Sequence, residues 1–214
     1  MRSSKPMPGN PWPHDMSITI DDRPNSLLEL LWIREAYELH PAGEDLPPLL
    51  IDTPPVVGEV SLNAGARDEW EHAWADVWSA AAAHAGRDIE PRLFEAISGT
   101  ANGSAERMDI LRQIVGPNWR DDVGDEVFAD GSYSEWSQRG MAAHLAEMPT
   151  ALEDSPERRE LDALIAAWRA GLTKIVTIPC SGVFTRKVAQ NALLTTNAIR
   201  SNSNDYRRAL STFT

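Results

Sequence analysis

Three tryptophans on one face of a single helix constrain this fold more than any other feature of the chain. Trp70, Trp74 and Trp78 recur at i, i+4 and i+8 within residues 66–87, the spacing that places side chains on one helix face. Each indole buries a large apolar area, so this face predicts a substantial core beside the helix. Gly86 is the expected stop signal.

Hydrophobic periodicity and turn residues predict the remaining elements. The other expected helices span residues 26–39, 91–98, 104–115, 134–147, 155–172 and 203 onward. The expected strands span residues 17–20, 173–178 and 192–196. Ser26 and Glu29 have the spacing of a capping box at the start of the first helix. We therefore expect an α+β fold: a predominantly helical single domain with a small sheet formed by a short N-terminal strand and C-terminal strands.

The distribution of proline predicts how the chain is divided. Residues 1–15 have no hydrophobic periodicity and form an expected flexible N-terminal arm, followed by one globular domain over 16–214. Within that domain, residues 41–58 contain five prolines and cannot form a regular helix. The arm and this proline-rich loop are the predicted contact elements.

Charge and cysteine content indicate the compartment and the class of partner. The chain has a net charge of −12, a single cysteine and no apolar run long enough to cross a bilayer. These features favour a cytoplasmic protein with no membrane partner, and 17 arginines against 3 lysines are typical of a bacterial genome rich in GC. Residues 41–160 carry 24 acidic and 9 basic side chains, whereas residues 161–214 carry 2 and 7. A protein partner with a basic surface is favoured, nucleic-acid contact through the basic C-terminal segment is the weaker alternative, and the oligomeric state is left open.

One short segment carries a candidate catalytic site. Cys180 and Arg186 form a Cys-x5-Arg pattern directly after the expected strand 173–178. The segment resembles the phosphate loop of protein tyrosine phosphatases over about fifteen residues, although Pro179 and Lys187 depart from the pattern. The resemblance implies a thiolate nucleophile at Cys180, a phosphate clamp at Arg186 and a general acid, for which Asp52 is the first candidate. A buried structural thiol is the competing interpretation.

The polar residues of the tryptophan helix offer a second candidate, a metal site. Asp68, His72 and Asp76 share one face at i, i+4 and i+8, but an amphipathic helix also requires a solvated face at that position. We interpret them as a charged surface row and expect neither a metal nor a cofactor. The sequence therefore predicts a cytoplasmic interaction or accessory protein with an acidic helical body, and the alternative is a cysteine-dependent phosphate-ester hydrolase.

Overall fold

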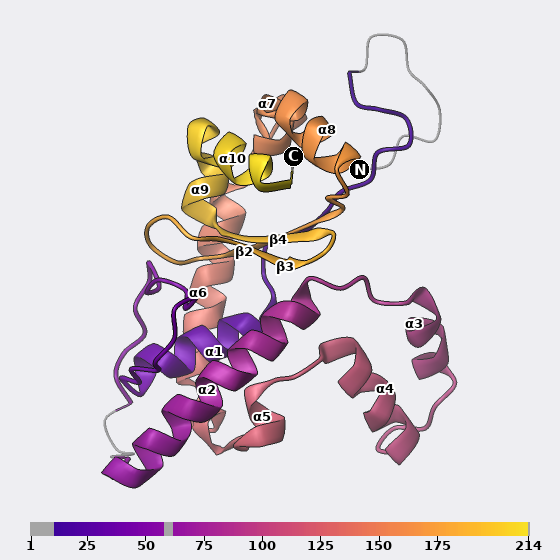
Figure 1. Cartoon of the computed structure of the whole chain (residues 1–214). Coiled ribbons are helices and arrows are strands. Elements are labelled where there is room, and N and C mark those ends of the chain that lie inside the picture. Colours follow the sequence, from indigo (N-terminus) through magenta and orange to yellow (C-terminus); the bar gives the residue numbers. More distant parts are fainter. Residues whose placement is uncertain (1–10, 58–61, 214) are drawn as a thin grey trace.

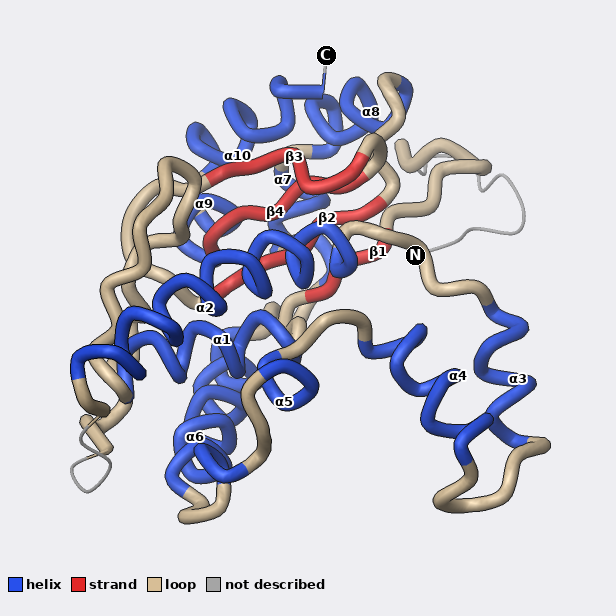
Figure 2. The backbone as a smooth tube through the Cα atoms, turned by 60° about the horizontal axis from the view of Figure 1, so that its bottom comes forward, coloured by secondary structure: helices blue, strands red, loops and turns tan. Residues whose placement is uncertain are grey.

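Strands from the two ends of the chain form one mixed sheet in the computed structural model, which describes residues 11–57 and 62–213. The strands lie in the order β1-β2-β4-β3 (Figures 1 and 2). Their bounds are β1 (Thr19–Asp21), β2 (Lys174–Ile178), β3 (Thr185–Ala189) and β4 (Ala192–Thr196). β1 and β4 both pair with β2 in parallel, and β3 returns antiparallel to β4. The predicted α+β fold with a small sheet is confirmed.

Helices cover both faces of this sheet. The α-helices are α1 (Asn25–Ala36), α2 (Ala64–Ala85), α3 (Pro91–Ser98), α4 (Ala105–Val115), α5 (Trp119–Asp122), α6 (Ser132–Glu147), α7 (Pro156–Arg159), α8 (Leu161–Arg169), α9 (Asn197–Ser201) and α10 (Ser203–Leu210). Figures 1 and 2 show α1 and α2 on one side of the sheet and α8 and α10 on the other. Among the described residues, no helix combines the length and the apolar character that a membrane crossing requires.

The alternation of side chains along the strands divides the interior into two cores. Val176, Ile178 and Leu194 face α1 and α2 and belong to the first core. Ile175 and Leu193 face α8 and α10 and belong to the second core. Successive residues of a strand point to opposite faces, and β2 and β4 are buried on both faces along their whole length. A central strand that is covered on both sides therefore has adjacent apolar residues, such as Ile175–Val176 in β2 and Leu193–Leu194 in β4, in place of an apolar–polar alternation.

The tryptophan face of α2 packs into the first core, as its spacing predicts. Trp74 and Trp78 are fully buried, and their rings stack with centroids 5.4 Å apart. Trp70 is partly buried, and its ring lies 5.2 Å from each of the rings of Tyr37 and Trp119. The helix thus joins α1 and α5 through aromatic contacts.

The predicted capping box is wrong. Helix α1 begins at Asn25 after Pro24, and no side chain caps its N-terminus. Ser26 therefore already lies inside the first turn, where its hydroxyl donates to the carbonyl oxygen of Val115 at 3.4 Å. Glu29 instead pairs with Arg120, whose Nη2 lies 2.9 Å from its Oε1. Tertiary partners take the two groups that the local motif would have used.

Only part of the predicted N-terminal arm is described, because residues 1–10 lie outside the described residues. Trp12 packs partly buried against the second core. Its Nε1 donates to the carbonyl oxygen of Met16 at 3.3 Å.

Candidate functional site

A buried pair of charged residues holds the proline-rich loop against the body. Arg34 and Glu35 lie near the end of α1, and each side chain is 6% exposed. Arg34 donates from Nη1 to the carbonyl oxygen of Pro47 at 2.6 Å and from Nη2 to that of Pro48 at 2.7 Å. Glu35 accepts the amide of Leu50 at 2.6 Å and pairs with Arg34 at 3.2 Å. Hydrogen bonds to charged groups are among the stronger ones, so the path of the loop is fixed.

The fixed path turns alternate side chains inward and outward. Leu50 forms an antiparallel bridge with Cys180 and is 4% exposed. The neighbouring Leu49 and Ile51 are 61% and 63% exposed. Their main chains are also paired, because the Ser181 amide donates to the Leu49 carbonyl at 2.7 Å and the Ile51 amide to the Pro179 carbonyl at 3.0 Å.

A third apolar residue is exposed close to the same segment. Val183 follows Ser181 by two residues and is 71% exposed. We name Leu49, Ile51 and Val183 the apolar ridge. Main-chain pairing holds Leu49 and Ile51 of this ridge, so their position does not depend on their own side chains.

The three predicted catalytic residues lie within the proline-rich loop or next to it, but they make different contacts. Cys180 is fully buried in the first core. Arg186 lies in β3, with its Nη2 3.8 Å from Oδ2 of Asp45. Asp52 accepts the Trp136 indole N–H at its carbonyl oxygen, and its carboxylate lies 3.5 Å from Arg139. Among the described residues, no hydrogen bond or ion pair joins any two of Cys180, Arg186 and Asp52.

The environment of Cys180 favours a neutral thiol. Burial raises the pKa of this thiol to about 12, because the apolar surroundings disfavour the charged thiolate. Arg34 opposes this shift and Glu35 adds to it. A nucleophilic cysteine needs a lowered pKa, so the competing interpretation as a structural thiol gains support.

Alkylation of Cys180 in the native protein is therefore expected to be negligible from pH 7 to 9. The reactive thiolate forms only above the pKa of about 12, whereas a free cysteine titrates near 8.5. The rate of iodoacetamide labelling against pH, in native protein and in protein unfolded with urea, measures this difference. Labelling of native protein that saturates below pH 8, and that phosphate slows, would contradict it and restore the phosphate loop.

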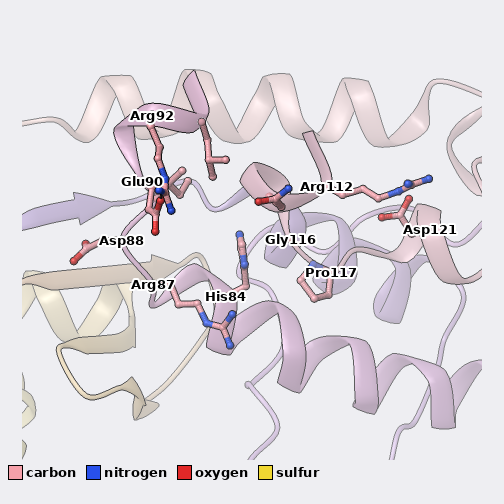
Figure 3. A pocket seen from close by; sticks show the side chains of 12 residues that line it. His84, Arg87, Asp88, Glu90, Arg92, Arg112, Gly116, Pro117 and Asp121 are labelled. Atoms are coloured by element: carbon pink, nitrogen blue, oxygen red, sulfur yellow. The ribbon is translucent and has the colours of Figure 1, made fainter. Parts of the chain in front are cut away.

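A cavity of about 510 Å³ lies between the end of α2 and the hairpin of α3 and α4 (Figure 3). Figure 3 shows His84 rising from α2 between Asp88 on one side and Gly116 on the other. His84 Nε2 lies 3.1 Å from the carbonyl oxygen of Ile114, and a Cβ at Gly116, where φ is +75°, would overlap the imidazole. The glycine is thus required for the close approach. The histidine is occupied in fixing the hairpin, which projects from the body in Figure 2.

The polar face of α2 is solvated, as its pattern predicts. Asp68, His72 and Asp76 are all exposed. His72 Nδ1 lies 2.7 Å from the carbonyl oxygen of Asp68, so this ring atom is engaged by the helix itself. No group of residues with metal-binding geometry is present in the described part of the chain.

Sequence reasoning missed Arg34 and Glu35, although the sequence contains a signal for them. They are adjacent charged residues in a helix that is apolar on its other sides. Charged groups are rarely buried unless they are paired. Such a pair inside an apolar helix indicates a structural hydrogen-bond site.

The comparisons with known proteins add no relative. No protein-family model matches the chain, and searches of curated proteins and of solved structures gave no significant match.

Proposed function

We propose that this chain is an interaction protein that docks a protein segment combining apolar and basic residues on its apolar ridge. One observation carries the proposal. A buried ion pair holds the proline-rich loop in a path that turns Leu49 and Ile51 to solvent. Neighbouring apolar residues that are exposed on a protein surface are typical of interaction sites.

The energetic cost of this arrangement supports a functional role. A buried ion pair such as Arg34–Glu35 commonly contributes less stability than apolar residues of the same size. A slip of one residue in an extended segment exchanges its two faces. Such a slip would bury Leu49 and Ile51 and expose only Leu50. The charged pair therefore maintains an arrangement that burial of apolar area alone does not favour.

Charge around the ridge favours a basic partner. The proline-rich loop itself, residues 41–58, contains three acidic side chains and no basic one. Asp45 and Asp52 of the loop are exposed and pair with arginines only at 3.8 and 3.5 Å. Exposed pairs of this kind contribute little, so cations of a partner can replace the arginines. Complementary charge speeds the encounter and selects the partner.

The basic C-terminal segment is less suited to bind nucleic acid. Six of its seven cations already contact other groups of the chain: Lys174 with the Arg87 carbonyl, Arg186 with Asp45, Lys187 with the Phe213 ring, Arg200 with Glu157, Arg207 with Glu160 and Arg208 with Asp205. Phosphate binding would have to displace several of these contacts. The phosphatase alternative stays a prediction, which the buried thiol does not favour.

A designed peptide tests the docking proposal. A labelled peptide of alternating lysine and leucine is expected to bind, and the double variant Leu49→Ser/Ile51→Ser is expected to weaken binding about a hundredfold or more. The expected loss follows from about 1.5–3 kcal/mol for each leucine or isoleucine that no longer becomes buried. Fluorescence anisotropy at low and high salt measures both the affinity and its electrostatic part.

Two controls make the result specific. Leu145 on α6 is exposed to a similar extent, so Leu145→Ser should leave peptide binding unchanged. A peptide with glutamate in place of lysine should bind more weakly than the lysine peptide. Equal binding of the lysine peptide to the double variant, or equal affinity for the two peptides, would overturn the proposal.

A further inference from the structure

A second cavity, of about 590 Å³, lies beside the carboxyl ends of β1 and β4. Asp22 follows β1 and Asn197 follows β4, and both line it together with the last turn of α6. In open sheets with parallel strands, ligands commonly bind outside the carboxyl ends of the strands. The location and volume are those of a site for a small molecule.

A histidine and an aspartate are paired in this cavity. His144 Nε2 of α6 lies 3.1 Å from Oδ2 of Asp22, and both side chains are partly shielded from solvent. The contact ties α6 to the end of β1 and fixes the orientation of the imidazole. His144 therefore reports on what enters the cavity.

An arginine in the cavity is held from behind by a buried carboxylate. Arg200 donates from Nε and Nη2 to Glu157 at 2.7 and 3.0 Å, and the hydroxyl of Tyr206 donates to the same carboxylate at 3.1 Å. Glu157 and Tyr206 are both buried. These contacts fix the position of the Arg200 guanidinium before any ligand binds. They leave Nη1 of Arg200 available, since the described residues provide no hydrogen bond to it.

A second arginine and an apolar wall complete the cavity. Arg159 is exposed and anchored through Nη2 to the carbonyl oxygen of Ser201 at 3.2 Å. Met148 and Leu152 also line the cavity, and they remain 51% and 46% exposed. The cavity therefore offers guanidinium donors beside apolar side chains that are about half exposed.

We propose that this cavity binds a small carboxylic acid with an apolar body. Arg159 and Arg200 would bind the carboxylate with the N–H donors that their contacts to Ser201 and Glu157 leave available, since a hydrogen bond between charged groups is a strong one. The apolar body would cover Met148 and Leu152. Asp22, Glu147 and Asp154 also line the cavity, and their negative charge opposes an anion with several charges, such as phosphate. A monocarboxylate gives the arginines an acceptor and, with a single negative charge, meets less repulsion from these acidic side chains than phosphate does.

Hexanoate is the probe that tests this site. Titration into the whole protein is expected to shift the imidazole resonances of His144 with a Kd on the order of 1 mM. Arg159→Gln removes one donor from an exposed side chain and is expected to weaken binding about tenfold or more. Arg169→Gln, an exposed arginine at the end of α8, is the matched control and should bind as the unmodified protein does.

The ligand class is tested with probes that differ from hexanoate in charge or in the length of the apolar chain. Hexylamine carries the opposite charge and should leave the His144 resonances in place, and inorganic phosphate should bind more weakly than hexanoate. Leu152→Ser should weaken hexanoate without changing the affinity for acetate. Unchanged His144 resonances with hexanoate, equal affinity of Arg159→Gln, or a preference for phosphate would overturn the proposal.

Discussion

Arg34→Met is expected to lower the free energy of unfolding by about 3–5 kcal/mol, the cost of removing one partner from a buried ion pair. The variant leaves Glu35 as an uncompensated buried charge and deprives the carbonyl groups of Pro47 and Pro48 of their donors. It also removes the guanidinium that lies 5.4 Å from the ring centroid of Trp74. Urea denaturation followed by tryptophan fluorescence measures the loss.

A double variant separates the cost of the unpaired charge from the rest of the loss. Arg34→Met/Glu35→Leu removes both charges and is expected to be more stable than Arg34→Met alone, because no unpaired charge remains. The control is Arg139→Met, since Arg139 and Asp52 are each 54% exposed, and its expected cost is below about 1 kcal/mol. A loss for Arg34→Met no larger than that for Arg139→Met would show that the loop is not held by this pair.

The Arg34→Met variant also links the stability of the loop to peptide binding. In Arg34→Met the carbonyl groups of Pro47 and Pro48 lose their donor. The loop is then no longer held in place, although the side chains of the apolar ridge are unchanged. The variant should therefore bind the lysine–leucine peptide more weakly at temperatures where it is still folded.

The elements that the sequence predicted best are those that local signals define. The helix predicted at 91–98 has the same bounds as α3, and the strand predicted at 192–196 has those of β4. Pro91 stands at the helix start and Gly99 follows its end, which are the usual signals for these positions. Prediction was weaker where a tertiary contact determines the bounds of a helix, as at Glu160. This residue interrupts the helix predicted at 155–172 and places a buried carboxylate 3.4 Å from Arg207.

In the candidate site, too, local sequence patterns did not predict the tertiary contacts. The Cys-x5-Arg spacing is a local pattern, whereas the environment of Cys180 depends on the face of the strand. Cys180 continues the alternation of Val176 and Ile178, which lie in the same core, so the period of two along the strand already placed its thiol inside. The partners of Arg34 were not predictable in this way, because the carbonyls of Pro47 and Pro48 belong to a loop without periodicity.

Trp74→Ala is expected to lower the free energy of unfolding by about 3–5 kcal/mol, the usual cost of truncating a fully buried aromatic side chain. Trp74 has no exposed surface, stacks on Trp78 and donates from Nε1 to the carbonyl oxygen of Leu30 at 2.6 Å. It therefore joins α2 to α1, the helix that carries the loop-holding pair. A loss of this size is a large fraction of the 5–15 kcal/mol that typically stabilises a domain.

Two further variants decide which part of Trp74 provides this stability. Trp74→Phe keeps most of the apolar area and loses the hydrogen bond to Leu30, so its expected cost is lower than that of Trp74→Ala. Phe94→Ala on α3 truncates an aromatic side chain that is 52% exposed, and we expect a cost below about 1 kcal/mol because little buried area is lost. Thermal and urea unfolding of the three variants give the ranking. If Phe94→Ala were as costly as Trp74→Ala, the projecting hairpin and not the contact between α1 and α2 would dominate the stability of this fold.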